Sequence, residues 1–443
     1  MHRFVVRLTW VMALLVLSGC ATFSEQFSGV ERQLLQGRPD QALALLEKDP
    51  GPERDRVLYL LNRAMLQRMN GQLEASNTSL EQAKKLMKQL YATSVSETAG
   101  SLTINDATRS YAGEPYEQVM VHLIEALNYL QMGQRDDARV EVLQMDVRLR
   151  ELHQKERSAY MEDAFGRYLA GMIYEELGEY SDAMISYRKA YQAYERQLQD
   201  FGVALPDGLK LALVRMSQRM GLTNEYQGYR ERFNIQQFDS VADLRKKGQV
   251  VFILGNGLAP KKQERTISLR DYRSNQLHRI ALPYYPKAPQ RILLGGLRLK
   301  TDGQQAAGSL VESVDAVAKK TLEEELPSIK VRALARAVAK SAMVREARRG
   351  NDDNHSNQLL GLLVNIATVA TERADTRSWV TLPSEFYLAS LSLPPGRYDI
   401  DVQLLGQRGG VVDSIEYRDI EVKAGVNQYH FYQWVSPADR KRN

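Results

Sequence analysis

A single cysteine carries the most specific chemistry in this chain of 443 residues. Cys20 is the only thiol, and it directly follows Leu17, Ser18 and Gly19. A basic start and an apolar run over residues 8–17 precede it, and that length is typical of a secretory signal because a membrane span needs about 20 apolar residues. The thiolate is a strong nucleophile, which suits this position to covalent acylation. The sequence therefore predicts a signal segment over residues 1–19 that ends at a modifiable thiol.

The segment from Leu17 to Cys20 resembles the lipobox of bacterial lipoproteins. The resemblance implies cleavage between Gly19 and Cys20, diacylation of the Cys20 thiol and usually a third acyl chain on the new amine. Ala21 stands where lipoproteins retained in the inner membrane typically carry Asp, which implies the outer membrane, with the body in the periplasm. Two or three acyl chains anchor a protein stably, whereas a single chain binds only reversibly. Residues 20–30 are then expected to form a lipidated tether.

Charge and composition narrow the classes of partner. Removal of residues 1–19 leaves 57 basic and 54 acidic side chains, a balance that does not favour nucleic acid. Once Cys20 is acylated, no thiol remains for a disulfide, a zinc site or thiol catalysis. The longest later apolar stretch, residues 359–370, contains Asn365 and Thr368, so we expect no later segment to span a membrane.

The other polar motifs lack the spacing that chemistry would require. Gly-Asn-Gly at 255–257 lacks the frame of a phosphate-binding loop and favours a hairpin turn. Residues 352–355 lack the spaced ligands of a calcium loop, and Ser309 lacks the flanking glycines of a hydrolase nucleophile. No two histidines of the mature chain lie three to five residues apart, as a helical metal site would need; they are His122, His153, His278, His355 and His430. We therefore predict no catalytic residue, no metal ligand and no cofactor, and a protein that is not an enzyme.

The elements that would position any site begin with a helical region over residues 31–235. A frame of small and aromatic residues recurs around its glycines: relative to Gly178, Gly171 lies seven before, Tyr174 four before and Ala183 five after. This frame resembles the tetratricopeptide repeat, most specifically over residues 165–190, and implies antiparallel helix pairs with a glycine in each turn. The glycines are irregularly spaced, 34, 62 and 45 residues apart. The residues assigned to packing between helices are Ala64, Gly71, Ala126, Tyr129, Gly133, Ala138, Gly171, Tyr174, Gly178, Ala183, Tyr187 and Ala190.

Such a repeat array predicts a protein partner, because stacked helix pairs normally create a concave binding surface. The polar and aromatic residues expected to line it are Tyr116, Asn128, Arg167, Tyr168 and Arg188. The predicted function is a scaffold or an assembly or regulatory factor for periplasmic or outer-membrane proteins. A narrower version resembles the repeat-bearing lipoproteins that activate peptidoglycan synthases. The alternative is an envelope enzyme or glycan-binding protein with a site between the middle region and the C-terminal strands.

Residues 248–375 predict a second domain of mixed strands and helices. Short apolar runs bounded by Gly, Pro and Asp indicate strands up to residue 299. Helices are expected over 311–326 and 329–348, because Pro327 suits the first turn of a new helix. A more apolar helix over 358–373 must be buried, and burial against the preceding helix is favoured over burial in a partner or a bilayer.

Residues 380–436 predict a small antiparallel β-sandwich that could pack on the middle region. Their apolar residues alternate with period two, and turns recur about every 8–12 residues. Asp375, Arg377 and Trp379 precede this region, and we expect Trp379 to anchor the domain junction with Asp375 and Arg377 paired nearby. The predicted fold class is an α+β multidomain chain with N-terminal tetratricopeptide-like repeats, a mixed α/β middle region and a C-terminal β-sandwich.

The chain as a whole is similar to an uncharacterised group of proteobacterial lipoproteins. The resemblance is carried by three segments: Ile104-Asn105-Asp106, Tyr116-Glu117 and the stretch from Asp375 to Pro383. It implies the same layout of anchor, repeats and strands, and it supplies no established activity.

Overall fold

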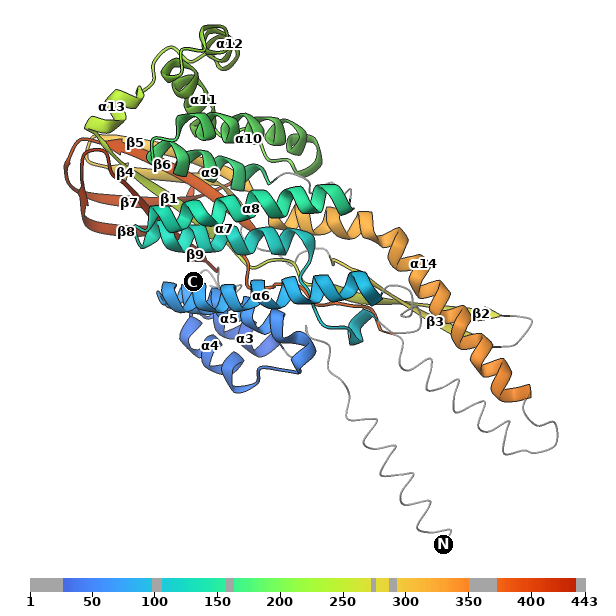
Figure 1. Cartoon of the computed structure of the whole chain (residues 1–443). Coiled ribbons are helices and arrows are strands. Elements are labelled where there is room, and N and C mark those ends of the chain that lie inside the picture. The colour runs from blue at the N-terminus through green and yellow to red at the C-terminus, as the bar shows by residue number, and fades with distance from the viewer. Residues whose placement is uncertain are drawn as a thin grey trace.

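The computed structural model describes residues 27–97, 106–156, 163–271, 276–286, 293–349 and 373–435 (Figure 1). The expected signal segment, Cys20 with its acylation and cleavage, the loop at 352–355 and the apolar helix over 358–370 lie outside these residues. Among the helices of the described ranges, none combines the length and the apolar character that crossing a membrane requires.

The N-terminal half is an array of antiparallel helix pairs like those of tetratricopeptide repeats. Each pair turns at a glycine with φ between 69° and 78°, a conformation that costs other residues energy. The turns are at Gly37, Gly71, Gly133, Gly178 and Gly221. The pairs are α3 (Ser28–Leu35) with α4 (Pro39–Lys48), α5 (Arg56–Met69) with α6 (Leu73–Glu97), α7 (Pro115–Gln131) with α8 (Arg135–Glu156), α9 (Ala164–Glu176) with α10 (Tyr180–Phe201), and α11 (Asp207–Arg219) with α12 (Thr223–Phe233). Shorter helices are η1 (Glu53–Asp55), η2 (Asp106–Thr108) and α13 (Val241–Lys246).

Small residues lie where these helices cross. A Cβ atom added to Gly171 on α9 would come within 2.4 Å of the Tyr187 ring on α10, so only glycine allows this approach. The alanines assigned to packing (Ala64, Ala126, Ala138, Ala183 and Ala190) are completely buried. Tyr174 is 7% exposed and Tyr129 is half-buried. The periodic frame in the sequence thus marks the contacts between helices.

Seven strands form one sheet with the order β8-β7-β4-β5-β6-β1-β9. Their bounds are β1 (Gly248–Asn256), β4 (Leu294–Thr301), β5 (Gln304–Glu312), β6 (Glu385–Leu393), β7 (Gly396–Gly406), β8 (Val411–Val422) and β9 (Asn427–Trp434). The sheet interleaves strands from residues 248–312 (β1, β4 and β5) with strands from residues 385–434 (β6–β9). Strand β1 lies between β6, which is antiparallel to it, and β9, which is parallel to it. This corrects the prediction of a separate mixed domain and a C-terminal β-sandwich, because strand pairing depends on contacts between segments far apart in the chain.

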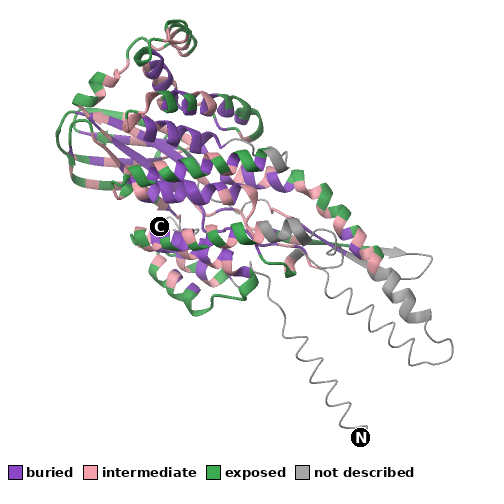
Figure 2. Ribbon diagram, in the orientation of Figure 1, coloured by how far each residue is buried: buried purple, intermediate pink, exposed green. Residues whose placement is uncertain are grey.

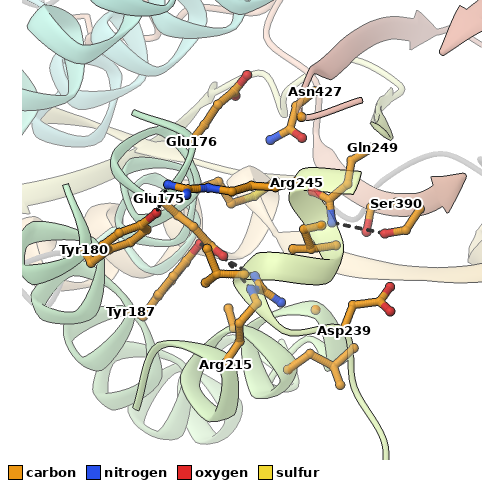
Figure 3. A pocket seen from close by; sticks show the side chains of 18 of the residues that line it. Glu175, Glu176, Tyr180, Tyr187, Arg215, Asp239, Arg245, Gln249, Ser390 and Asn427 are labelled. Atoms are coloured by element: carbon orange, nitrogen blue, oxygen red, sulfur yellow. Dashed lines mark hydrogen bonds and ion pairs between the residues drawn. The ribbon is translucent and has the colours of Figure 1, made fainter. Parts of the chain in front are cut away.

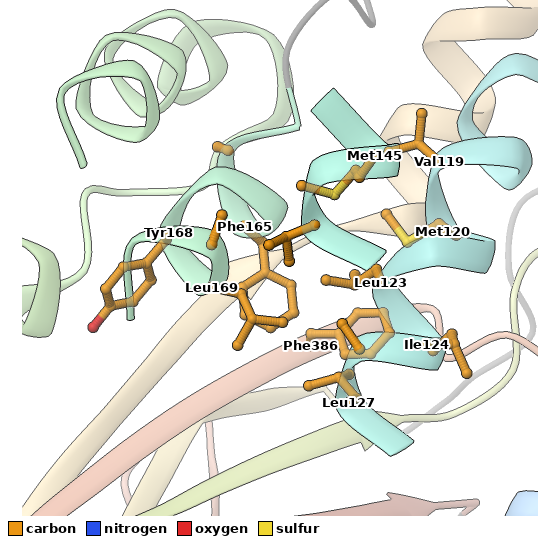
Figure 4. Close-up of a cluster of buried hydrophobic side chains, with 14 of the residues drawn as sticks. Val119, Met120, Leu123, Ile124, Leu127, Met145, Phe165, Tyr168, Leu169 and Phe386 are labelled. Carbon is orange, nitrogen blue, oxygen red and sulfur yellow. The ribbon is translucent and has the colours of Figure 1, made fainter. Parts of the chain in front are cut away.

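One face of the sheet is covered by the helical array. Phe386 of β6 packs against Phe165 of α9 with ring centroids 5.6 Å apart, and Figure 4 shows it among leucines and methionines of α7–α9. In Figure 2 the buried residues, coloured purple, are concentrated where the helices meet the sheet. The helices and this face therefore share one hydrophobic core.

The opposite face of the sheet encloses a second core, because the sheet curls until its edge strands meet through side chains. The Trp434 indole N–H on β9 donates to Asp413 Oδ2 on β8 at 2.8 Å. Phe252 on β1 meets Tyr417 on β8 with ring centroids 4.7 Å apart. This apolar interior lies between strands of the middle region and strands of the C-terminal region, where the alternative function would place a site.

A long arm projects from the body in Figure 1. It consists of α14 (Val314–Arg349) and the two-stranded sheet of β2 (Gln263–Asp271) and β3 (Gln276–Tyr284). Pro327 lies inside α14, which corrects the prediction that a new helix starts there. Packing of Ile329 and Ala333 against Ile280 and Leu282 of β3 holds the helix beyond the proline.

Candidate functional site

Most residues predicted to line a concave surface are buried inside the molecule. Tyr116, Asn128, Arg167 and Tyr168 are at most 5% exposed. The sheet fills the inner side of the helical array, so Tyr116, Asn128 and Arg167 belong to the internal packing, whereas Tyr168 lines the cavity described below. Arg188 on α10 is half-buried, and its Nε lies 3.0 Å from Glu225 Oε2 on α12. The prediction was wrong for Tyr116, Asn128 and Arg167, because a repeat frame does not reveal which part of the chain occupies its inner side.

The predicted junction residues connect the sheet to the helical array. Trp379 is completely buried, and its backbone N–H donates to Glu117 Oε1 on α7 at 2.7 Å. Arg377 lies 2.6 Å from Asp375 and 2.8 Å from Asp55 beside α5. Burial, together with the nearby Glu114 carboxylate, raises the pKa of Glu117 to about 7. The segment 373–384 therefore docks into the helices through one indole and several charged contacts.

A cavity of about 340 Å³ opens where α9–α11 and α13 approach the ends of β1, β6 and β9 (Figure 3). Its lining is mixed, with polar groups from both the helices and the sheet. The residues that define its character are Glu175, Tyr187, Arg215, Arg245, Ser390 and Asn427. Gly208 at the start of α11 allows the wall to close, since a Cβ there would come within 2.3 Å of the Tyr168 hydroxyl. The cavity has the volume of a small ligand site, and its lining is more polar than is usual for such sites.

A buried ion pair forms the fixed wall of this cavity. Arg215 Nη2 lies 2.8 Å and Nε 2.5 Å from the two oxygens of Glu175, and the Tyr187 hydroxyl donates to Glu175 Oε2 at 2.6 Å. Burial opposes the charge on Arg215, but Glu175 outweighs it and raises the pKa of this guanidinium. Burial likewise raises the pKa of the Tyr187 hydroxyl. A bidentate pair of this kind positions α9, α10 and α11 relative to one another.

The mouth of the cavity carries positive charge. Arg245 on α13 is exposed, and its Nη2 donates to the Tyr180 hydroxyl at 2.7 Å. The guanidinium of Arg219 lies 4.9 Å above the ring of the same tyrosine. A capping box of Ser240 and Asp243 fixes the first turn of α13 and so places Arg245. Arg245 at the opening, with Arg219 on the outer side of Tyr180, favours a ligand that brings a carboxylate.

The chemistry of the lining is suited to binding. The Glu175 carboxylate is held by Arg215, the Glu176 carboxylate by Arg135, and the Asp239 carboxylate lies 2.8 Å from Lys247. Two serines also line the cavity, and no histidine does so among the described residues. Each of these carboxylates thus has a cation beside it, and the charges of the lining can orient a bound segment.

A second polar cluster lies buried between α6, α7 and α8. His122 Nδ1 is 2.8 Å from Glu141 Oε2, and the Lys84 ammonium lies 2.6 Å from Glu125 and 3.0 Å from Glu141. Burial and the neighbouring Glu141 raise the pKa of Glu125 to about 10. Burial disfavours the charged form of Glu141, but His122 and Lys84 outweigh it and lower the pKa of Glu141 to about 2. Burial lowers the pKa of His122. At neutral pH the cluster thus holds one negative and one positive charge.

One imidazole and two carboxyl groups of this cluster are of types that bind metals. Ligand atoms of His122, Glu125 and Glu141 lie within 4.8 Å of one another. The ammonium group of Lys84 already lies within 3.0 Å of the carboxyl groups of Glu125 and Glu141, where it supplies the cation. We therefore assign the cluster a structural role. The spacing of the histidines in the sequence does not indicate this cluster. A local signal is present, because Glu125 follows His122 by three residues and so lies on the same helical face.

The cavity residues have no shared local signal in the sequence. Glu175 and Arg215 lie 40 residues apart on successive helix pairs. Ser390 and Asn427 come from strands whose pairing is decided only in the folded molecule. One local signal concerns the helix that carries Arg245. The spacing of Ser240 and Asp243 is typical of a capping box and indicates the start of α13.

No protein-family model matches the chain, and no curated protein matches it. Among solved structures, the crystal structure of MamA is 14% identical, covers 46% of this chain and 91% of its own, and has a TM-score of 0.30. The TPR-like repeats of a putative kinesin light chain from Podosopora anserina are 17% identical over 47% of this chain and 92% of theirs, with a TM-score of 0.31. The apo form of RapI is 12% identical over 53% of this chain and 61% of its own, with a TM-score of 0.35. Because these TM-scores are low, we base no conclusion about function on the likenesses.

Proposed function

We propose that this protein is an outer-membrane lipoprotein, anchored through acyl chains on Cys20, whose periplasmic body is a scaffold for a protein partner. The lipobox-like segment Leu17–Cys20 supports the anchor and the address. The array of helix pairs supports the scaffold. One class of partner is a peptidoglycan synthase, whose activity should change when the purified protein is added.

The cavity between α9–α13 and the sheet is the observation that carries the scaffold proposal. The inner side of the array is filled by the protein's own sheet, so a partner must use a surface that this packing leaves open. The cavity is such a surface, with a rigid Glu175–Arg215 wall, Arg245 at its mouth and Arg219 stacked on the lining residue Tyr180. A partner segment that inserts a carboxylate side chain would form charge-assisted hydrogen bonds there.

Site-specific crosslinking in the native envelope tests this assignment. A photoreactive amino acid at Ala242, an exposed position beside the cavity mouth, should yield one discrete protein adduct. Arg245→Glu should remove that adduct by placing a like charge against the partner's carboxylate. The matched control is Arg150→Glu on the exposed surface of α8, which should leave the adduct unchanged.

Two results would contradict the proposal. One is the absence of any protein adduct from position 242 while the variant remains folded and membrane-associated. The other is an adduct that survives Arg245→Glu at full yield, which would place the partner elsewhere.

A further inference from the structure

The outer half of α14 exposes an apolar stripe. Val331, Leu334 and Val338 are 68%, 52% and 57% exposed. Their spacing of three and four residues places them on one helical face. The side of the helix that carries Ile329 and Ala333 is already packed on β3. An exposed apolar face of this kind is expected to be buried against another surface.

The charge of α14 changes sharply along its length at Pro327. Residues 314–326 contain two lysines and four acidic residues. Residues 327–349 contain seven basic residues and a single acidic one, Glu346. A basic helix with an apolar stripe is typical of elements that lie on an anionic membrane surface. Charge complementarity therefore favours an anionic leaflet as the occupant of the stripe.

The base of the arm lies beside the first described helix. Lys261, two residues before β2, forms an ion pair with Glu31 on α3. Glu264 on β2 accepts the backbone N–H of Ala374 at 2.9 Å. The arm thus starts next to the place where the chain enters the body at Phe27.

The length of the tether brings this place close to the membrane. Phe27 comes seven positions after Cys20, a distance of at most about 25 Å when the chain is fully extended. The 23 residues of α14 from Pro327 to Arg349 extend over about 35 Å. A body held by acyl chains on Cys20 therefore keeps the arm within reach of the leaflet.

We propose that the outer half of α14 lies on the anionic phospholipid leaflet that holds the anchor. Val331, Leu334 and Val338 enter the boundary between headgroups and acyl chains, and the flanking Lys330 and Arg332 contact the lipid phosphates. The arm then sets the orientation of the body on the membrane, which the flexible acyl anchor alone does not. This inference rests on the anchoring proposed above.

Photo-crosslinking of the lipidated full-length protein tests the assignment, in vesicles that contain phosphatidylglycerol. A photoreactive amino acid at position 334 should form a phospholipid adduct that mass spectrometry identifies. The matched control is Leu143 on α8, which is 41% exposed and lies outside the arm, and it should give at least tenfold less lipid adduct. The double variant Lys330→Glu and Arg332→Glu should lower the adduct at position 334 severalfold while thermal unfolding stays unchanged.

Three results would overturn the inference. They are an adduct within residues 358–370 of the same chain, an adduct to a partner protein in intact cells in place of lipid, and equal lipid labelling from positions 334 and 143. Mass spectrometry of Cys20 in the same samples distinguishes failure of the proposed contact between α14 and lipid from failure of the proposed anchor. An acylated Cys20 with no lipid adduct at position 334 would reject the arm contact alone, whereas a bare thiol would reject the anchoring on which it rests.

Discussion

The buried cluster on α6–α8 allows a sharp test, because two substitutions in it should behave in opposite ways. Lys84→Met removes the ammonium group that lies 2.6 Å from Glu125 and 3.0 Å from Glu141. Glu125→Gln replaces a carboxyl group that is already protonated at neutral pH, since its pKa is raised to about 10. The amide of a glutamine has nearly the same shape and can still donate to Glu141. The first change leaves a buried charge without its partner, and the second does not.

The magnitudes follow from burial. Removal of one partner from a buried ion pair typically costs about 3–5 kcal/mol, which we expect for Lys84→Met at pH 7. Glu125→Gln should change the free energy of unfolding by no more than about 1 kcal/mol at pH 5. Above the ordinary carboxyl pKa of 4.5, wild-type Glu125 keeps a proton in the folded state that the unfolded chain has released. Wild-type stability therefore falls as the pH rises from 4.5 toward 10, by up to about 1.4 kcal/mol per pH unit from this group.

Urea unfolding of the two variants and the wild type between pH 5 and 8.5 measures these differences. The Glu125→Gln protein should gain stability relative to the wild type as the pH rises, and Lys84→Met should be the least stable throughout. Equal losses from the two substitutions at pH 7 would refute the assigned protonation states. A Glu125→Gln protein that loses stability relative to the wild type at high pH would do the same.

Four further predictions concern the core, a helix crossing, an open position on α12 and the anchor. Trp379→Ala should lower the free energy of unfolding by about 3–5 kcal/mol in chemical denaturation, because the indole is completely buried between the helices and the sheet. Gly171→Ala should cost about 1–3 kcal/mol, since the new methyl meets the Tyr187 ring. Gly228→Ala on α12 has nothing within 4 Å of the new methyl and should stabilise the protein by up to about 1 kcal/mol. Cys20→Ala should release the protein from the outer-membrane fraction, and intact mass measurement should show the acyl chains only on the wild type; a fully membrane-bound variant would count against the anchor.

The helical part could be predicted from the sequence because its signals are local. A turn glycine such as Gly178 and a small residue such as Gly171 sit at fixed offsets within one helix pair. The backbone conformation and the close crossing that they permit involve only residues a few turns away. The same locality explains why Pro327 misled the prediction. A proline favours a helix start, but packing of α14 on β3 held the helix together across it.

The sheet could not be predicted in the same way. Alternation and turns in the last 60 residues indicated strands, and the short apolar run Val250–Leu254 indicated another. Neither pattern identifies the neighbouring strand, so β1 was not expected between β6 and β9. The exposure of Tyr116 or Arg167 likewise depends on what fills the inner side of the helical array.

Local spacing along the chain therefore determined the helix pairs, the turn glycines, the strand positions and the candidate lipid anchor, because each depends on neighbours within a few turns. Tertiary structure alone decided the mixed sheet, the loss of an open concave surface, the cavity and the Lys84 cluster. These features depend on atoms that are distant in the sequence and close in space, and only packing reveals which buried charge meets which partner.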